Sequence, residues 1–422
     1  MKGLRGTVPF SVDAKLVLLL IATYSLNIDL GASLRPVDLV IALLFLYTLV
    51  TGKLRVDTMA VVSLLLLLAV LSAGWGALLD PSDLAVRFGL GLLLKYAELL
   101  FLIWSISSLS LTSNEINQLL KISAAVFLVI MAYVFLRAPL AAVGLMRIQH
   151  LRPDFPFTRL EPGQSPAGHL MGMYLTTGFV MLISHRVISK ASSLVTVLII
   201  LLGISSILLT GSRTPFIALA GTTVVAVAFL PRQFGRVRQQ TLRLFLFGAA
   251  IGAVSVIAFL GSEILDSDQV GALFQRATSF DFANDASASG RVAKSRTGLL
   301  NVWSSGILIG PGSLRFGAWF DNGLVRVLHD FGLVGLIVAL ILVGRISIHA
   351  LDTETVYGKI AFLGITCFAI GNVATEFFLV PRASVPFIVA TFLLIRRAKT
   401  ASRSEPTLPP NDNGPCDAPY TT

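Results

Sequence analysis

Apolar runs of close to 20 residues, separated by short polar connections, repeat along almost the whole chain. Each run is long enough to cross the roughly 30 Å hydrocarbon core of a bilayer as a helix. The first run follows a basic start but lacks a small-residue cleavage site, so it is interpreted as a retained span. The pattern predicts twelve transmembrane helices, at about 14–31, 36–52, 58–79, 88–107, 119–137, 167–185, 193–210, 214–231, 241–261, 324–344, 356–376 and 383–396.

Composition agrees with this pattern, because 55% of the 422 residues are hydrophobic and only 13% are charged. Soluble proteins keep about a quarter of their residues charged. The net charge of +10 does not indicate nucleic-acid binding, because the basic residues cluster in short connections on one side of the predicted membrane. By the positive-inside rule that side is the cytoplasm, which also holds both termini. The basic residues on this side are Lys53, Arg55, Lys121, Arg186, Lys190, Arg232, Arg236, Arg238, Arg243, Arg345, Lys359, Arg396, Arg397 and Lys399.

Two long hydrophilic segments fall on the opposite face, 138–166 and 262–323. The expected architecture is an all-α polytopic membrane domain over residues 1–398, in which 262–323 forms one large external loop. The Pro-rich polar segment 399–422 is predicted to be a disordered cytoplasmic tail. The two cysteines, one in an apolar run and one in the tail, indicate neither a disulfide nor a metal framework.

Arg213 is the first candidate for chemistry on the outer face, in "LLTGSRTPFIALAG". Gly211 and Ser212 before it and Pro215 after it predict a tight turn that opens a helix. Backbone N–H groups at a helix start favour an anion, and the planar fork of a guanidinium suits phosphate oxygens. The alternative is an arginine that only anchors a helix end at the headgroups.

Further basic residues lie in the two external segments. Arg152 and Arg159 belong to 138–166, and Arg291, Lys294 and Arg296 belong to "ASASGRVAKSR". All except Lys294 are candidate substrate contacts. The second group could equally contact anionic lipid headgroups.

The stretch "WFDNGLVRVLHDFGLVG" at 319–335 opens a membrane helix with an unusual number of polar groups. Asn322, Arg326 and His329 are four and three residues apart, so they line one helix face. Polar groups at the edge of hydrocarbon are costly and indicate function, so this face is predicted to border a water-accessible cavity. The alternative is a structural ion pair between Arg326 and Asp330.

Other motifs favour a structural role or carry no function. Lys95 and Glu98 are predicted to neutralise each other inside the bundle. "GPG" at 310–312 is predicted to be a turn, because no strand precedes it and a dinucleotide fingerprint needs a third glycine. The acidic pair Asp266 and Asp268 has the spacing of a metal–nucleotide site, but nucleotide sugars are absent outside the cell.

These pieces together resemble the O-antigen ligase and polymerase family of bacterial membrane glycosyltransferases. The resemblance covers the multi-span layout over most of the chain. It is sharpest in "LLTGSRTPFIALAG", in "SGR" at 289–291 and in "LIGPGSLRFGAWFDNGLVRVLHDFGLVG". In the last stretch the matches to the family pattern are Gly310 and Gly312 of a turn, Asn322, and the closing Gly332 and Gly335.

The resemblance implies a GT-C-like fold and an oligosaccharide donor on a polyprenyl (undecaprenyl) diphosphate. Arg213 and Arg291 match the family's diphosphate-binding arginines. Asp321 stands where ligases carry the His that helps to activate the acceptor hydroxyl, and a carboxylate can also serve as base. Arg213, Arg291 and Asp321 are therefore the predicted catalytic residues of an inverting glycosyltransferase that needs no metal or other cofactor. The departure at Asp321 favours a polymerase over a ligase.

The expected setting is the bacterial inner membrane, with the active site facing the periplasm. Predicted partners are the donor, an acceptor glycan or lipid A–core, membrane lipids and a chain-length regulator, with no nucleic acid. Two other functions stay open. A secondary transporter fits the number of spans, although transporters are usually built from repeated halves with midplane sites. A non-catalytic assembly subunit is the third alternative.

Overall fold

The computed structural model describes residues 10–24, 36–54, 56–79, 82–142, 168–188, 193–210, 212, 214–229, 286–312, 322–353, 355–374, 378 and 381–404. Within these ranges no strand occurs, which confirms the all-α expectation. The helices are α1 (Val12–Tyr24), α2 (Pro36–Val50), α3 (Val56–Leu79), α4 (Asp83–Ser108), α5 (Ser113–Ala142), α6 (Gly168–Ile188), α7 (Ser193–Leu209), α8 (Thr214–Phe229), α11 (Ala286–Ser305), α12 (Gly323–Asp352), α13 (Val356–Ala374) and α14 (Pro381–Ser404).

The helices follow the apolar pattern closely. Each predicted span overlaps one of them except 241–261, which lies outside the described residues. Among the described residues, four helices contain segments long and apolar enough to cross a membrane, and four more carry shorter apolar segments. The long segments are Leu90–Ser108, Ser113–Leu136, Gly323–Asp352 and Val356–Val373. The described part of the chain is therefore all-helical with four candidate membrane spans, as expected of an α-helical membrane protein. The total number of spans and the GT-C-like arrangement stay predictions.

Two helices depart from the expected pattern. α14 continues to Ser404, so residues 399–404 are helical and not part of a disordered tail as predicted. The other helix is α11. α11 lies inside the segment 262–323, for which the sequence predicts a hydrophilic external loop. Arg291, Lys294 and Arg296 keep this stretch below the hydropathy of a span, and apolar runs alone do not reveal a polar helix. The polar segment is thus partly helical.

Many large apolar side chains point outward rather than into the bundle. On α3 these include Leu67 and Leu71, and on α12 they include Ile337, Leu340 and Ile341. A water-soluble protein rarely exposes so much contiguous apolar surface. These faces suit contact with lipid chains, in agreement with the apolar spans.

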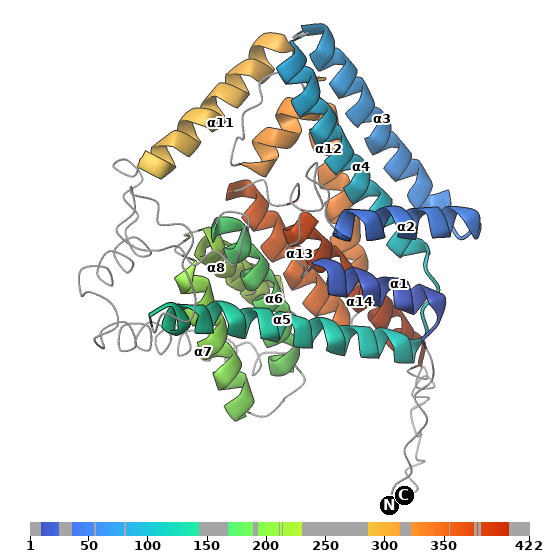
Figure 1. Ribbon diagram of the computed structural model, residues 1–422, viewed down its shortest axis with the longest axis vertical. Helices are drawn as coiled ribbons and strands as arrows, with labels where there is room; N and C mark the ends of the chain where they lie inside the picture. The colour runs from blue at the N-terminus through green and yellow to red at the C-terminus, as the bar shows by residue number, and fades with distance from the viewer. Residues whose placement is uncertain are drawn as a thin grey trace, which may run out of the picture.

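α13 lies at the centre of the arrangement and packs against α6, α8, α12 and α14 (Figure 1). Small residues make the close packing possible. Gly371 and Gly364 of α13 lie directly against Met173 and Met181 of α6, with no room for a side chain in between. Membrane helices commonly associate through such small residues, because the backbones can then approach closely.

Basic side chains gather at one end of the helices. Lys53, after α2, forms an ion pair of 2.7 Å with Asp13 at the start of α1. Arg396 near the end of α14 donates a hydrogen bond of 2.9 Å to the carbonyl of Ser107 at the end of α4. The guanidinium of Arg397 lies over the Tyr357 ring at the start of α13. These basic residues are among those predicted to share one side, and the assignment of that side to the cytoplasm stays a prediction.

Candidate functional site

The C-terminal end of α13 brings together three helix starts that are far apart in the sequence. A Cβ on Gly323, the first residue of α12, would lie 2.7 Å from the Asn372 carbonyl oxygen of α13. Met173 near the start of α6 packs against α13, and its neighbour Gly172 faces Pro215 at the start of α8. The residues that flank the predicted catalytic positions 213 and 321 therefore lie at the same end of the bundle.

Four of the nine predicted site residues belong to segments that the structure does not describe. Arg213, Asp321, Arg152 and Arg159 lie outside the described residues. Arg291 belongs to α11, which packs against α12. Arg296 is exposed on α11.

Asn322 has a structural role at the start of α12. Its side-chain oxygen accepts hydrogen bonds from the backbone N–H groups of Leu324 and Val325, at 3.0 and 3.1 Å. Asn is a preferred N-cap because it satisfies N–H groups that lack a partner in the first turn. The oxygen of this amide is occupied by these two hydrogen bonds. A role of Asn322 in substrate binding stays a prediction.

Arg326 and His329 are buried, and they contact the carboxylate of Asp330. The Arg326 Nε donates to Asp330 Oδ2 at 2.7 Å, and His329 Nδ1 lies 3.1 Å from Oδ1. The hydroxyl of Tyr96, from α4, donates to Oδ2 at 2.9 Å. All three residues of α12 are at most 1% exposed. The ion pair given as the alternative for this stretch is confirmed, while a water-accessible cavity beside this helix face stays a prediction.

α12 is broken immediately after this cluster. Gly332 has φ 64° and ψ −166°, which is not helical. In an unbroken helix the N–H groups of residues 333 and 334 would bond to the carbonyls of residues 329 and 330. Here Leu333 and Val334 donate instead to the carbonyls of Ile307 and Leu308, at 2.9 and 3.3 Å.

The two carbonyls released by the break also find partners. The His329 carbonyl accepts from the N–H of Gly312 at 3.3 Å, and the Asp330 carbonyl accepts from the hydroxyl of Ser72 on α3. The turn at 306–312 therefore replaces the missing helical bonds. Irregular backbone at membrane depth is tolerated only where protein groups satisfy it in this way, so turn and break form one unit.

Glycines make this unit possible. Gly310, Gly312 and Gly332 all have positive φ, between 64° and 90°. A Cβ on Gly310 would lie 2.5 Å from the His329 carbonyl oxygen, and one on Gly312 would lie 2.5 Å from that of Ser72. The turn glycines and the closing glycine that carry the family resemblance thus belong to one contact. Their spacing in the sequence was the signal, but the sequence does not reveal the contact itself.

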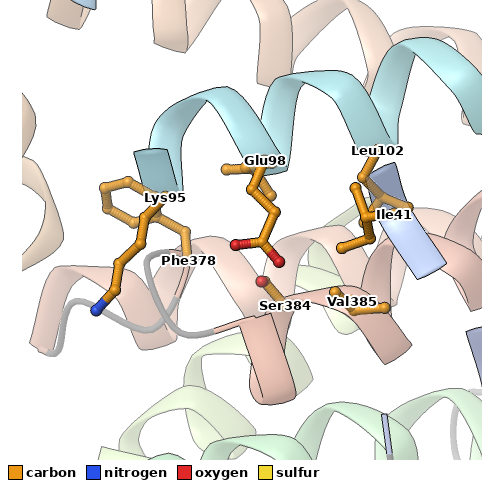
Figure 2. A pocket seen from close by; sticks show the side chains of 8 residues that line it. Ile41, Lys95, Glu98, Leu102, Phe378, Ser384 and Val385 are labelled. Atoms are coloured by element: carbon orange, nitrogen blue, oxygen red, sulfur yellow. The ribbon is translucent and has the colours of Figure 1, made fainter. Parts of the chain in front are cut away.

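A small pocket lies beside this unit, between α2, α4 and α14 (Figure 2). Its empty volume is about 210 Å³, part of which is open to the exterior. The Glu98 carboxylate points toward the hydroxyl of Ser384, whereas the Lys95 ammonium points away from both (Figure 2). Phe378, which also lines the pocket, lies 6.2 Å from the Tyr96 ring between ring centres. The pocket is therefore linked through Tyr96 to the Asp330 cluster.

Comparison with known proteins leaves the family open. No protein-family model matches the chain, and no curated protein is similar to it. The resemblance to O-antigen ligases and polymerases therefore remains a prediction.

Proposed function

We propose that the protein is a glycosyltransferase that moves an oligosaccharide from a polyprenyl diphosphate to an acceptor sugar hydroxyl on the outer face of the inner membrane. In this reaction it polymerises the repeat units of a surface polysaccharide. The observation that carries the proposal is the joined turn and helix break. It joins Gly310, Gly312 and Gly332 of the stretch that resembles the family. The helix that contains the break also starts at the same end of the bundle as α8, which follows Arg213 in the sequence.

The reaction is a single inverting displacement. The acceptor oxygen forms a bond to the anomeric carbon of the donor, and the bond from that carbon to the diphosphate oxygen breaks. Asp321 takes the acceptor proton, and the polyprenyl diphosphate leaves with its added negative charge. Arg213 and Arg291 stabilise that charge, which is the main electrostatic demand of the step.

The contacts of Asp330 support a fixed electrostatic environment near this site. Arg326 is held by a buried carboxylate, so its guanidinium has a defined position. Preorganised charges are more effective than mobile ones, because they need no rearrangement as the reaction proceeds. Arg326 therefore contributes a positive charge at a fixed position. It belongs to the first half of α12, which begins two residues after Asp321.

The test is an assay with purified protein and a lipid-diphosphate oligosaccharide, in which lengthened glycan is measured. Arg213→Ala and Arg291→Ala should each lower the rate by ~10²–10³. Arg213→Lys should also lose most activity, because lysine keeps the charge but not the planar fork. Asp321→Asn removes basicity at nearly unchanged shape and should abolish turnover, while Asp321→His should keep part of it.

The matched control is Arg345→Ala, an exposed arginine in the second half of α12, which should leave the rate unchanged. Full activity in both Arg213→Ala and Asp321→Asn would overturn the proposal. Lipid A–core as the acceptor in place of a second repeat unit would identify a ligase instead.

A secondary transporter is the second candidate, and one observation favours it. Broken helices at membrane depth are typical of transporter substrate sites, and α12 combines a break with buried charged residues. Uptake or release of a solute by protein in sealed vesicles, with no glycan lengthened, would select this alternative.

A further inference from the structure

α11 is the least embedded helix of the described part of the chain. It packs against α12, and in Figure 1 the rest of the helix (yellow) slants away from the bundle. It carries Arg291, Lys294 and Arg296 within six residues, so it is too charged to be a membrane span. Nevertheless it exposes several large apolar side chains, and this combination needs an explanation.

The side chains of α11 fall into three sectors around its axis, given the helical rotation of about 100° per residue. Gly298 and Val302 are buried on the sector that faces the protein. Thr297 and Ser304 are exposed on a polar sector. Between these two lies an apolar sector, which is exposed throughout. Its members are Val292 (66% exposed), Leu299 (47%), Leu300 (59%) and Trp303 (78%).

This apolar sector continues into the turn that enters the α12 break. Ile307, Leu308 and Ile309 are each between 42% and 60% exposed, although their backbone lies against α12. Leu333 and Val334, which donate hydrogen bonds to this turn, belong to the exposed apolar face of a candidate membrane span. The apolar surface of α11 is therefore an extension of a surface that contacts lipid chains.

The charges of α11 suit the same environment. Arg296 is exposed within the apolar sector, between Trp303 and Leu300 in helical rotation, and Lys294 is exposed toward the polar sector. Long basic side chains place their apolar stems along lipid and their charges among headgroups. A helix with an apolar face, a polar face and basic residues is the pattern of an element that lies in the membrane interface.

We propose that α11 and the turn 306–312 form an interfacial element, which inserts its apolar sector at the headgroup–acyl boundary of an anionic phospholipid leaflet. Lys294 and Arg296 bind the phosphates of that leaflet. The inference does not depend on the proposed glycosyl transfer. The turn 306–312 would then contact lipid on one side and supply the hydrogen bonds of the α12 break on the other. A displacement of α11 in the membrane would therefore be transmitted to the break.

The experiment uses full-length protein in liposomes, with Cys367→Ala and Cys416→Ser as the background. Single cysteines replace Leu300 or Trp303 in the apolar sector and Thr297 or Ser304 in the polar sector, and each is labelled with bimane. Lipids that carry a nitroxide just below the headgroup serve as the quencher. We expect quenching at 300 and 303 to exceed that at 297 and 304 by about threefold or more.

The leaflet composition is tested in the same samples. Adding phosphatidylglycerol to phosphatidylcholine should increase quenching at 303, and Lys294→Gln with Arg296→Gln should remove that increase. Equal quenching in the two sectors would overturn the proposal, as would protection of position 303 from both the lipid quencher and aqueous iodide, which would indicate a second protein surface there. Quenching that is independent of phosphatidylglycerol would overturn the anionic preference. Since no arm measures activity, failure of the proposed function leaves the result intact.

Discussion

Asp330 shows how a single side chain organises its surroundings. Its carboxylate contacts Arg326, His329 and Tyr96, and its backbone carbonyl accepts from Ser72. A buried guanidinium is acceptable only beside a compensating charge, and removing one partner of a buried pair costs about 3–5 kcal/mol. Asp330→Asn should therefore lower the melting temperature in detergent markedly.

Replacing both Arg326 and Asp330 with apolar residues distinguishes the cost of an unpaired buried charge from the cost of lost packing. The double variant Arg326→Met with Asp330→Leu should melt closer to the parent protein than Asp330→Asn, because apolar pairs often replace buried ion pairs at little cost. Asp352→Asn, which changes an exposed acid on the same helix, should have no measurable effect. If Asp330→Asn melts as the Asp352→Asn control does, the ion pair does not stabilise α12.

At the scale of the element, α12 consists of two helical segments that meet at Gly332. The break persists because the turn at 306–312 supplies hydrogen bonds that the helix gives up. An alanine at position 332 would need positive φ and would press its Cβ against the Leu308 carbonyl. Gly332→Ala should therefore destabilise the protein and release the turn. The readout is faster hydrogen exchange at the N–H groups of Leu333 and Val334.

α12 itself provides the control for this prediction. Gly344 lies in a helical segment, and a Cβ at this position would meet no atom within 4 Å. Gly344→Ala should be neutral or stabilise by roughly 0.5–1 kcal/mol, since alanine has the higher helix propensity. Equal exchange and equal melting of the two variants would contradict a role for the break in holding the turn.

For the whole molecule, the cluster around Asp13 ties the first helix to two later connections. Its carboxylate accepts hydrogen bonds from Lys53, Tyr47 and the Ser110 N–H, each at 2.7 Å. Burial by itself would raise the pKa of Asp13, but these hydrogen bonds outweigh burial and lower the pKa below its ordinary value. A carboxylate of this kind stabilises the fold above its unfolded-state pKa of about 3.9, and the contribution is lost as the pH falls through the folded-state pKa.

The corresponding experiment compares melting temperatures of the parent protein and Asp13→Asn from neutral pH to about pH 3. The variant should be less stable at neutral pH, and the two curves should converge in acid, because the parent loses the same interaction there. Parallel curves over the whole range would show that Asp13 does not connect these segments. The cluster holds together segments that no apolar pattern relates.

The sequence by itself determined the class of protein and the position of its apolar helices. An apolar run of about 20 residues is a local property, and burial in lipid needs no knowledge of the neighbours. It also marked positions 310, 312, 322 and 332, because turns and caps restrict the residue type locally. It did not identify α11 as a helix, since a polar helix depends on what its faces contact.

Only the tertiary structure decided how these marked positions are used. Asp330 meets Tyr96 and Ser72 across separations of 234 and 258 residues, and no local pattern specifies such partners. The same holds for the turn that completes the broken helix and for the apolar sector that α11 exposes. Hydrogen-bond partners and exposed faces are properties of packing between helices, so they became defined only when the helices were brought together.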